Sequence, residues 1–151
     1  MKKILNILIF IPFLFLGCQY APIYSNKDKF NFKIENIDFT GDVEINNLID
    51  KKLKKYKTTK SGEKVSISTF SSYEKISQSK NLSGKTTDYL VVIKTSFEIE
   101  MDDKTNMLIF REEFLIKNFS NKFEENNFEK IKKENSIDLI INKLVTQISQ
   151  I

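Results

Sequence analysis

The chain has 151 residues, with 24 Lys or Arg against 20 Asp or Glu and a formal net charge of +4. It contains no histidine and four glycines, and its one cysteine lies near the N-terminus. The usual transition-metal ligands, the usual general base at neutral pH and a phosphate-cradling glycine loop are therefore missing. We expect no enzyme, no catalytic or metal site, and no nucleic-acid partner, because the charge excess is small.

The first 18 residues have the pattern of a cleaved export signal. Lys2 and Lys3 are followed by an apolar stretch, Ile4 to Leu16, that is too short to span a bilayer as a helix. The following Gly17-Cys18 resembles a bacterial lipobox, in which cleavage precedes a cysteine that then carries lipid. We expect a signal peptide at 1–17 and covalent lipid on Cys18, with no other cofactor. The alternative is an ordinary secretory signal cut elsewhere, which leaves an unpaired thiol.

The region after the cysteine divides into a tether and a domain. Residues 18–29 contain Pro22 and no hydrophobic period, so they read as a lipidated N-terminus and tether, and 30–151 is of a size that suits one domain. Removing Lys2 and Lys3 from the net charge of +4 leaves +2. Apolar residues alternate over 30–39 with a change of phase after Ile34, which predicts a strand with a bulge or bend.

A helix is predicted to follow, capped by the carboxylate of Asp42. Its apolar stripe is formed by Ile45, Leu48, Ile49, Leu53 and Tyr56. A lysine run at 51–55 is interpreted as a solvated face, with a binding patch as the alternative.

The middle of the chain is rich in Ser and Thr. Lys64 to Ile76 predicts a long strand whose register the pattern leaves open. Ser77 to Thr86 predicts a loose polar connector that carries Lys80 and Lys85.

Residues 88–101 and 106–119 predict a hairpin. If residues 102–105 form a four-residue loop, paired residue numbers sum to 207, so that Phe97 faces Phe110 and the apolar faces coincide. Glu112 then falls on the core-facing side, at a bulge or sheet edge or else as a functional buried acid. The acidic pairs at 102–103, 112–113 and 124–125 are interpreted as turn and surface residues.

The opposite face of this hairpin also carries apolar residues, among them Val92, Ile109 and Leu115. An antiparallel sheet with one solvated face normally shows clean alternation, so these residues indicate either a partner-covered face or scattered surface apolar residues. From Lys122 to Ile151 a helical stripe without Pro or Gly predicts a long final helix. The predicted class is α+β, with a mostly antiparallel four-stranded sheet, two helices on one face and the order β-α-β-β-β-α.

The stretch that begins at Cys18 carries a family resemblance. Tyr20, Pro22 and Tyr24 match the mature N-terminus of the lipopolysaccharide-assembly lipoproteins of Gram-negative outer membranes, whereas Gln19 replaces their glycine. Size and element order are also similar over the whole mature chain. The resemblance implies a plug subunit that sits inside an outer-membrane β-barrel translocon, helps it assemble and contacts lipopolysaccharide. It also implies anchoring in the outer membrane on the periplasmic side.

The antiparallel meander puts four lysines, Lys80, Lys85, Lys117 and Lys122, at one end of the sheet, where they could converge on lipid A phosphates. Ordinary solvated lysines are the alternative. Two other functions stay open: an accessory lipoprotein of a lipid-transport ATPase system, and a structural lipoprotein without dedicated cargo.

Overall fold

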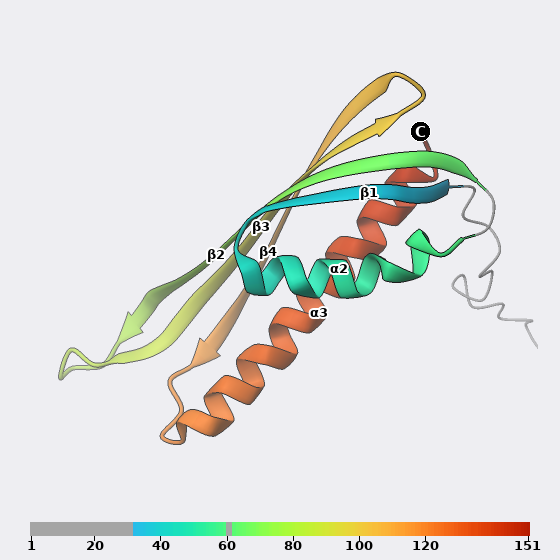
Figure 1. The fold of residues 1–151 in the computed structure, drawn as a ribbon. Coiled ribbons are helices and arrows are strands. Elements are labelled where there is room, and N and C mark those ends of the chain that lie inside the picture. The colour runs from blue at the N-terminus through green and yellow to red at the C-terminus, as the bar shows by residue number, and fades with distance from the viewer. Residues whose placement is uncertain (1–31, 60–61) are drawn as a thin grey trace, which may run out of the picture.

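The computed structural model describes residues 32–59 and 62–151 (Figure 1). Its elements are β1 (Phe32–Gly41), α2 (Val43–Lys57), β2 (Glu63–Lys80), β3 (Thr86–Met101), β4 (Lys104–Lys117) and α3 (Lys122–Ile148). This confirms the predicted class and element order. The expected signal peptide, the lipidated Cys18 and the tether lie outside the described residues.

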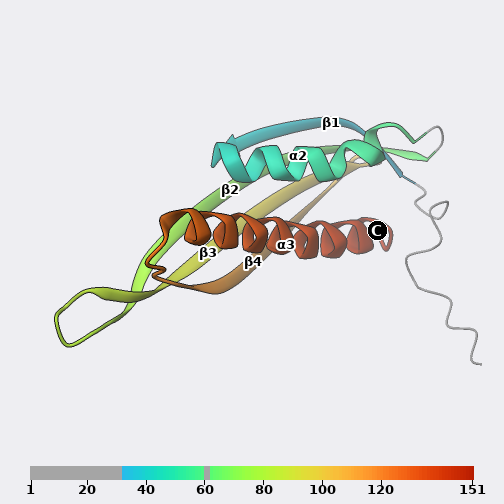
Figure 2. The same ribbon diagram turned by 90° about the horizontal axis from the view of Figure 1, so that it is seen from below.

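The four strands form one sheet in the order β1-β2-β3-β4. β1 and β2 are parallel, because α2 carries the chain back to the end at which β1 began. The other two pairs are antiparallel. Both helices lie on one face of the sheet (Figure 2), as the sequence predicts.

The turn between β1 and α2 depends on Gly41 and Asp42. Gly41 has a φ of 91°, and a Cβ atom there would lie 1.9 Å from the carbonyl oxygen of Ser71. Only glycine fits this close approach without displacing β2. The predicted cap is confirmed, because Oδ1 of Asp42 accepts a hydrogen bond from the amide of Ile45 at 2.9 Å.

The apolar core lies between the sheet on one side and α2 with the C-terminal half of α3 on the other. Alternate residues of β3 point into it, and the helix contributes residues at helical spacing. The fully buried side chains include Ile67, Ile93, Phe97, Ile99, Ile137, Ile140 and Leu144. The predicted irregularity of β1 is also confirmed, because its register with β2 shifts between Ile34 and Asn36.

The hairpin of β3 and β4 corrects the predicted register. The partners sum to 205 rather than 207, so that Phe97 faces Leu108 and Thr95 faces Phe110. The turn contains only Asp102 and Asp103, with φ angles of 47° and 60°, which is the conformation that a two-residue hairpin turn requires. A shift of two residues preserves the faces, so the division into core and outer residues still holds.

Candidate functional site

The tip of the hairpin between β2 and β3 is more ordered than the predicted loose connector. β2 continues to Lys80 and β3 begins at Thr86, which leaves only five turn residues. Oδ1 of Asn81 accepts hydrogen bonds from the amides of Ser83 at 3.1 Å and Lys85 at 2.9 Å, and the amide of Asn81 donates to the carbonyl of Lys85 at 2.9 Å. The Asn side chain thus replaces missing backbone partners and fixes the turn.

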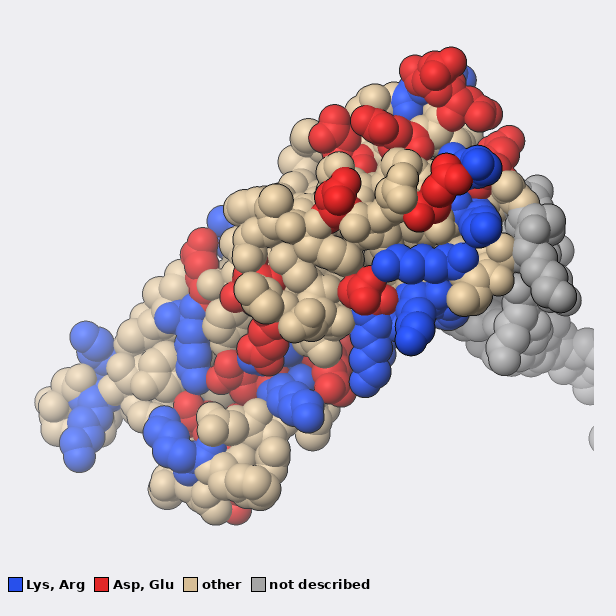
Figure 3. Space-filling view, viewed as in Figure 1, with Lys and Arg blue, Asp and Glu red and all other residues tan. Residues whose placement is uncertain are grey.

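Three of the four predicted lysines lie together at this end of the sheet. Lys80 ends β2, Lys85 is the last residue of the turn, and both are exposed. Lys117, the last residue of β4, pairs in register with Asp88, the third residue of β3, and Asp88 in turn faces Ser79 of β2. Basic side chains are prominent over the far left end of the molecule, where the hairpin tip lies (Figure 3).

The exposed hairpin tip also carries one apolar side chain, that of Leu82. Its neighbours Ser83 and Gly84 carry no charge, so that the tip combines two cations with one exposed aliphatic group. This combination matches the two parts of an anionic lipid, a phosphate-bearing head and an acyl chain.

Lys122 also lies at this end, at the start of α3, but its ammonium group has a partner. Its Nζ lies 3.0 Å from Oε2 of Glu125, three residues later in the helix. Glu125 is only 2% exposed, which corrects the expectation that it is a surface residue. Lys122 therefore contributes an ion pair to the folded domain.

Glu125 belongs to a cluster of charged groups beneath the sheet. Lys75, on the core-facing side of β2, lies 3.1 Å from Glu125 and 2.7 Å from Glu129. The hydroxyl of Tyr73 donates to Glu129 at 2.5 Å, and Lys133, buried one helical turn later, pairs with Glu129 at 3.5 Å. Ion pairs and a hydrogen bond thereby join the polar half of α3 to β2.

The cluster keeps its groups charged in spite of burial. Burial raises the pKa of Glu125, but hydrogen bonds from Lys122 and Lys75 outweigh it, so the pKa lies below its ordinary value. The same balance lowers the pKa of Glu129, through Lys75 and Tyr73. Burial lowers the pKa of Lys75, but its two carboxylate partners raise it by more, to above its ordinary value.

The pKa of Tyr73 is raised by burial and by its hydrogen bond to Glu129. Sequence reasoning missed the whole cluster. The one signal in the sequence is that Lys75 falls on the same face of β2 as the buried Val65 and Ile67.

The outer face of the sheet presents two of the three predicted partner-facing residues. Ile109 and Leu115 are 71% and 56% exposed. Val92 is only 3% exposed, because it lies on the central strand β3 between Glu74 and Glu113 of the neighbouring strands. Its side chain therefore cannot meet a partner in this conformation. Glu112 reaches α3 and pairs with Lys143 at 2.6 Å, as a sheet-edge residue would.

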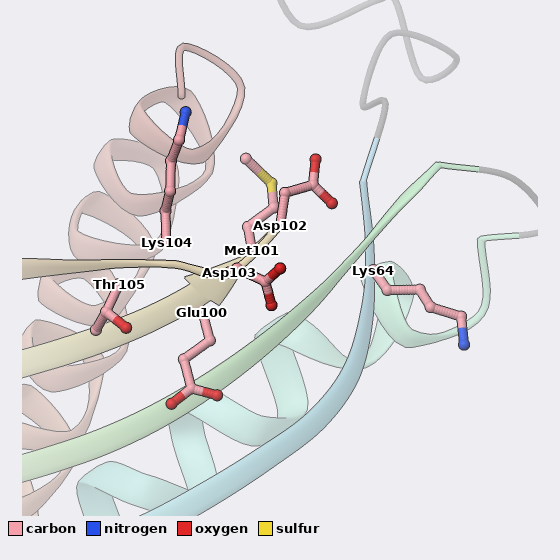
Figure 4. Close-up of a pocket in the computed structure, with 7 residues that line it drawn as sticks. All are labelled: Lys64, Glu100, Met101, Asp102, Asp103, Lys104 and Thr105. Carbon is pink, nitrogen blue, oxygen red and sulfur yellow. The ribbon is translucent and has the colours of Figure 1, made fainter.

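The opposite end of the sheet, around the turn of β3 and β4, is rich in acidic residues. A hollow of about 340 Å³ there is lined by Lys64, Glu100, Met101, Asp102, Asp103, Lys104 and Thr105. Figure 4 shows that their side chains point in different directions rather than toward one common point. The hollow therefore lacks the convergent polar groups of a binding site.

Within residues 32–59 and 62–151, no group of three or more His, Cys, Asp or Glu side chains could hold a metal ion. No helix in this described part is long and apolar enough to cross a membrane.

The fold is similar to that of solved bacterial lipoproteins. Rare lipoprotein B from Shewanella oneidensis matches with a TM-score of 0.50 and 14% identity, covering 76% of this chain and 95% of its own. An uncharacterized lipoprotein B from Nitrosomonas europaea matches with a TM-score of 0.55 and 12% identity, covering 82% and 88%. No protein-family model and no curated protein matches the sequence. At these identities the likeness shows a shared fold.

Proposed function

We propose that this protein is a lipid-anchored, non-catalytic envelope protein that supports lipopolysaccharide assembly as the plug of an outer-membrane β-barrel translocon. Cys18 carries the anchor, on the periplasmic side of the outer membrane. The tip of the hairpin between β2 and β3 contacts lipid A, and the open face of the sheet meets the barrel. No catalytic group and no cofactor besides the covalent lipid is part of this proposal.

The observation that carries the proposal is the exposed tip with Lys80, Lys85 and Leu82, next to Lys117. Two cations and an aliphatic side chain on an ordered turn suit a phosphorylated lipid, because ammonium groups bind phosphates as point charges. The long hairpin also extends beyond the end of β4 and the start of α3 (Figure 1), so that a large ligand can approach it.

The exposed residues Ile109 and Leu115 support a contact with a large partner on the outer face. Apolar side chains exposed on a sheet face that no described helix covers are accessible to a protein partner. The shared fold with two bacterial lipoproteins supports the lipobox reading of Cys18. Palmitate labelling that is lost in Cys18→Ala would test the anchor directly.

A photo-crosslinking amino acid at position 115 tests the partner. In living cells we expect it to capture an outer-membrane β-barrel protein, whereas the same crosslinker at Lys54 on the exposed side of α2 should not. Capture of an inner-membrane transporter subunit would instead identify a lipid-transport ATPase system. If other positions capture a barrel protein and position 115 does not, the outer face of the sheet is not the surface that contacts the barrel.

A further inference from the structure

The outer edge of β4 is a free strand edge. β4 is the last strand of the sheet, and its outer edge pairs with no other strand in the described part of the chain. It is 14 residues long and contains neither Pro nor Gly. An edge of this length without a bulge, Pro or Gly to interrupt it is a template for another strand.

The sequence of this edge is self-complementary. Residues 108 to 116 are symmetric about residue 112 in their apolar positions and carry opposite charges at 111 and 113, in the order Leu108, Ile109, Phe110, Arg111, Glu112, Glu113, Phe114, Leu115 and Ile116. An antiparallel copy centred on residue 112 places Leu108 opposite Ile116, Ile109 opposite Leu115, Phe110 opposite Phe114, and Arg111 opposite Glu113. Each directly opposed pair is then apolar with apolar or basic with acidic, except at the centre.

We propose that two copies of this chain pair through β4 in antiparallel orientation about a two-fold axis at residue 112, which joins their sheets into one. A two-fold axis perpendicular to the sheet keeps the helices of both copies on the same side, so that outer residues meet outer residues. The exposed Ile109 and Leu115 then pair across the interface. Arg111 of each copy meets Glu113 of the other, once on each side of the axis. Because Arg111 also pairs with Glu113 of its own copy, the four groups form a network of alternating charge.

Neighbouring registers lack this match. A centre at residue 111 brings Arg111 onto itself and Ile109 onto Glu113, and a centre at residue 113 brings Glu113 onto itself and Arg111 onto Leu115. Like charges directly opposite, or a charge opposite an aliphatic group, disfavour both alternatives. The charge pattern therefore selects one register.

At the centre of the interface, each Glu112 carboxylate has a basic partner in its own copy. Glu112 faces the same residue of the other copy across the axis, but each carboxylate already pairs with Lys143 of α3 at 2.6 Å. Leu139, one turn before Lys143, lies on the flank of α3 that faces β4 and is exposed. It adds an apolar group on the helix side of the same edge.

The inference goes beyond the proposed function and does not depend on it. The dimer covers Ile109 and Leu115, which the proposed barrel contact also uses. The dimer and the barrel complex are therefore mutually exclusive states. Measurements on the purified protein, without a barrel partner, test the dimer alone.

Charge reversal in the full-length protein in detergent tests the dimer by sedimentation equilibrium. We expect the parent to be dimeric by about 100 µM. Arg111→Glu and Glu113→Arg each create four like charges at the axis, which should weaken self-association at least about tenfold. An equal mixture of the two variants should restore it, because every directly opposed pair at positions 111 and 113 of the hybrid interface joins an acidic to a basic side chain. The matched control Glu98→Arg, exposed on the same face of the central strand β3, should associate as the parent does.

Circular dichroism spectra of each variant serve as the control for folding. Two anchored chains could also sediment together because they share one detergent micelle. Such sharing would not depend on the charges at positions 111 and 113, so loss of association in the single variants and its recovery in the mixture distinguish pairing through β4 from micelle sharing. A parent that stays monomeric over the whole range overturns the proposal. So do single variants that associate as tightly as the parent, or a mixture that stays monomeric.

Discussion

The two halves of α3 bind the same sheet by different chemistry. From Ile137 onward the helix buries apolar side chains against β3 and its neighbours, including Ile140 and Leu144. Before that point Glu125, Glu129 and Lys133 meet β2 through ion pairs with Lys75 and each other. The apolar half lies toward the acidic turn of β3 and β4, and the ion-paired half lies toward the basic hairpin tip (Figure 1).

We expect the two halves of α3 to contribute differently to stability and to specificity. Apolar burial contributes about 1.5 to 3 kcal/mol per large side chain and needs no exact partner. A buried ion pair contributes little net free energy, because desolvation offsets attraction, but removal of one member costs much more. We therefore expect the apolar half to hold the fold together and the ionic half to hold the tip in one orientation.

The largest effect is expected in the apolar half. Leu144→Ala removes a fully buried side chain and leaves a cavity, which should lower the free energy of unfolding by about 3 kcal/mol. Leu139→Ala, on the same helix but 52% exposed, should change it by less than about 0.5 kcal/mol. Urea unfolding measures both. Equal losses would mean that the helix does not pack as described.

A smaller effect is expected in the ionic half. Glu125→Gln leaves Lys122 without its carboxylate and Lys75 with only one, and should cost about 2 kcal/mol at pH 7. Glu124→Gln, exposed in the same first helical turn, loses the same helix-dipole interaction and serves as the control. Urea unfolding in which both variants lose equally would remove the role of the buried cluster.

The same variant has a characteristic pH dependence. Because the pKa of Glu125 is lowered in the folded state, its contribution is complete above the ordinary value of 4.5 and disappears as the pH falls through the folded-state pKa. The gap in unfolding free energy between parent and Glu125→Gln should therefore be constant at neutral pH and close below pH 4.5. A gap that persists in acid would mean that lost packing, not lost charge, explains the effect.

The smallest effect is expected for an ion pair at the surface. Lys52 of α2 lies 2.6 Å from Asp138 of α3, but both side chains are substantially exposed. A double-mutant cycle with Lys52→Ala and Asp138→Ala should give a coupling of about 0.2 to 1 kcal/mol. If the same kind of cycle gave Lys52 and Asp138 a coupling as large as that of Lys75 with Glu125, buried and exposed ion pairs would not differ in strength as expected.

Local patterns predicted much of the fold. The cap at Asp42, the bulge of β1 and the division of β3 and β4 into two faces each follow from side-chain spacing over a few residues. The hairpin register was missed by two residues, because two adjacent aspartates adopt a positive φ that composition alone does not indicate.

The candidate site was harder to predict. The end of the sheet that holds Lys80, Lys85 and Lys117 followed from the topology, but the order of the turn depends on one side chain, that of Asn81. The ionic cluster joins Lys75 to residues about 50 positions later, and such contacts depend on how a helix crosses a sheet. The spacing of residues along the chain does not indicate the angle and position at which α3 crosses the sheet.

Binding of purified lipopolysaccharide to the full-length protein tests directly whether the basic hairpin tip contacts lipid A, as proposed. We expect Lys80→Glu with Lys85→Glu to weaken binding at least about tenfold, because each lysine near an anionic lipid surface contributes about 1 kcal/mol. The control reverses Lys51 and Lys54, two exposed lysines of α2, and should bind as the parent does. Unchanged binding by the tip variant, or an equal loss in the control, would contradict a lipid A contact at the hairpin tip.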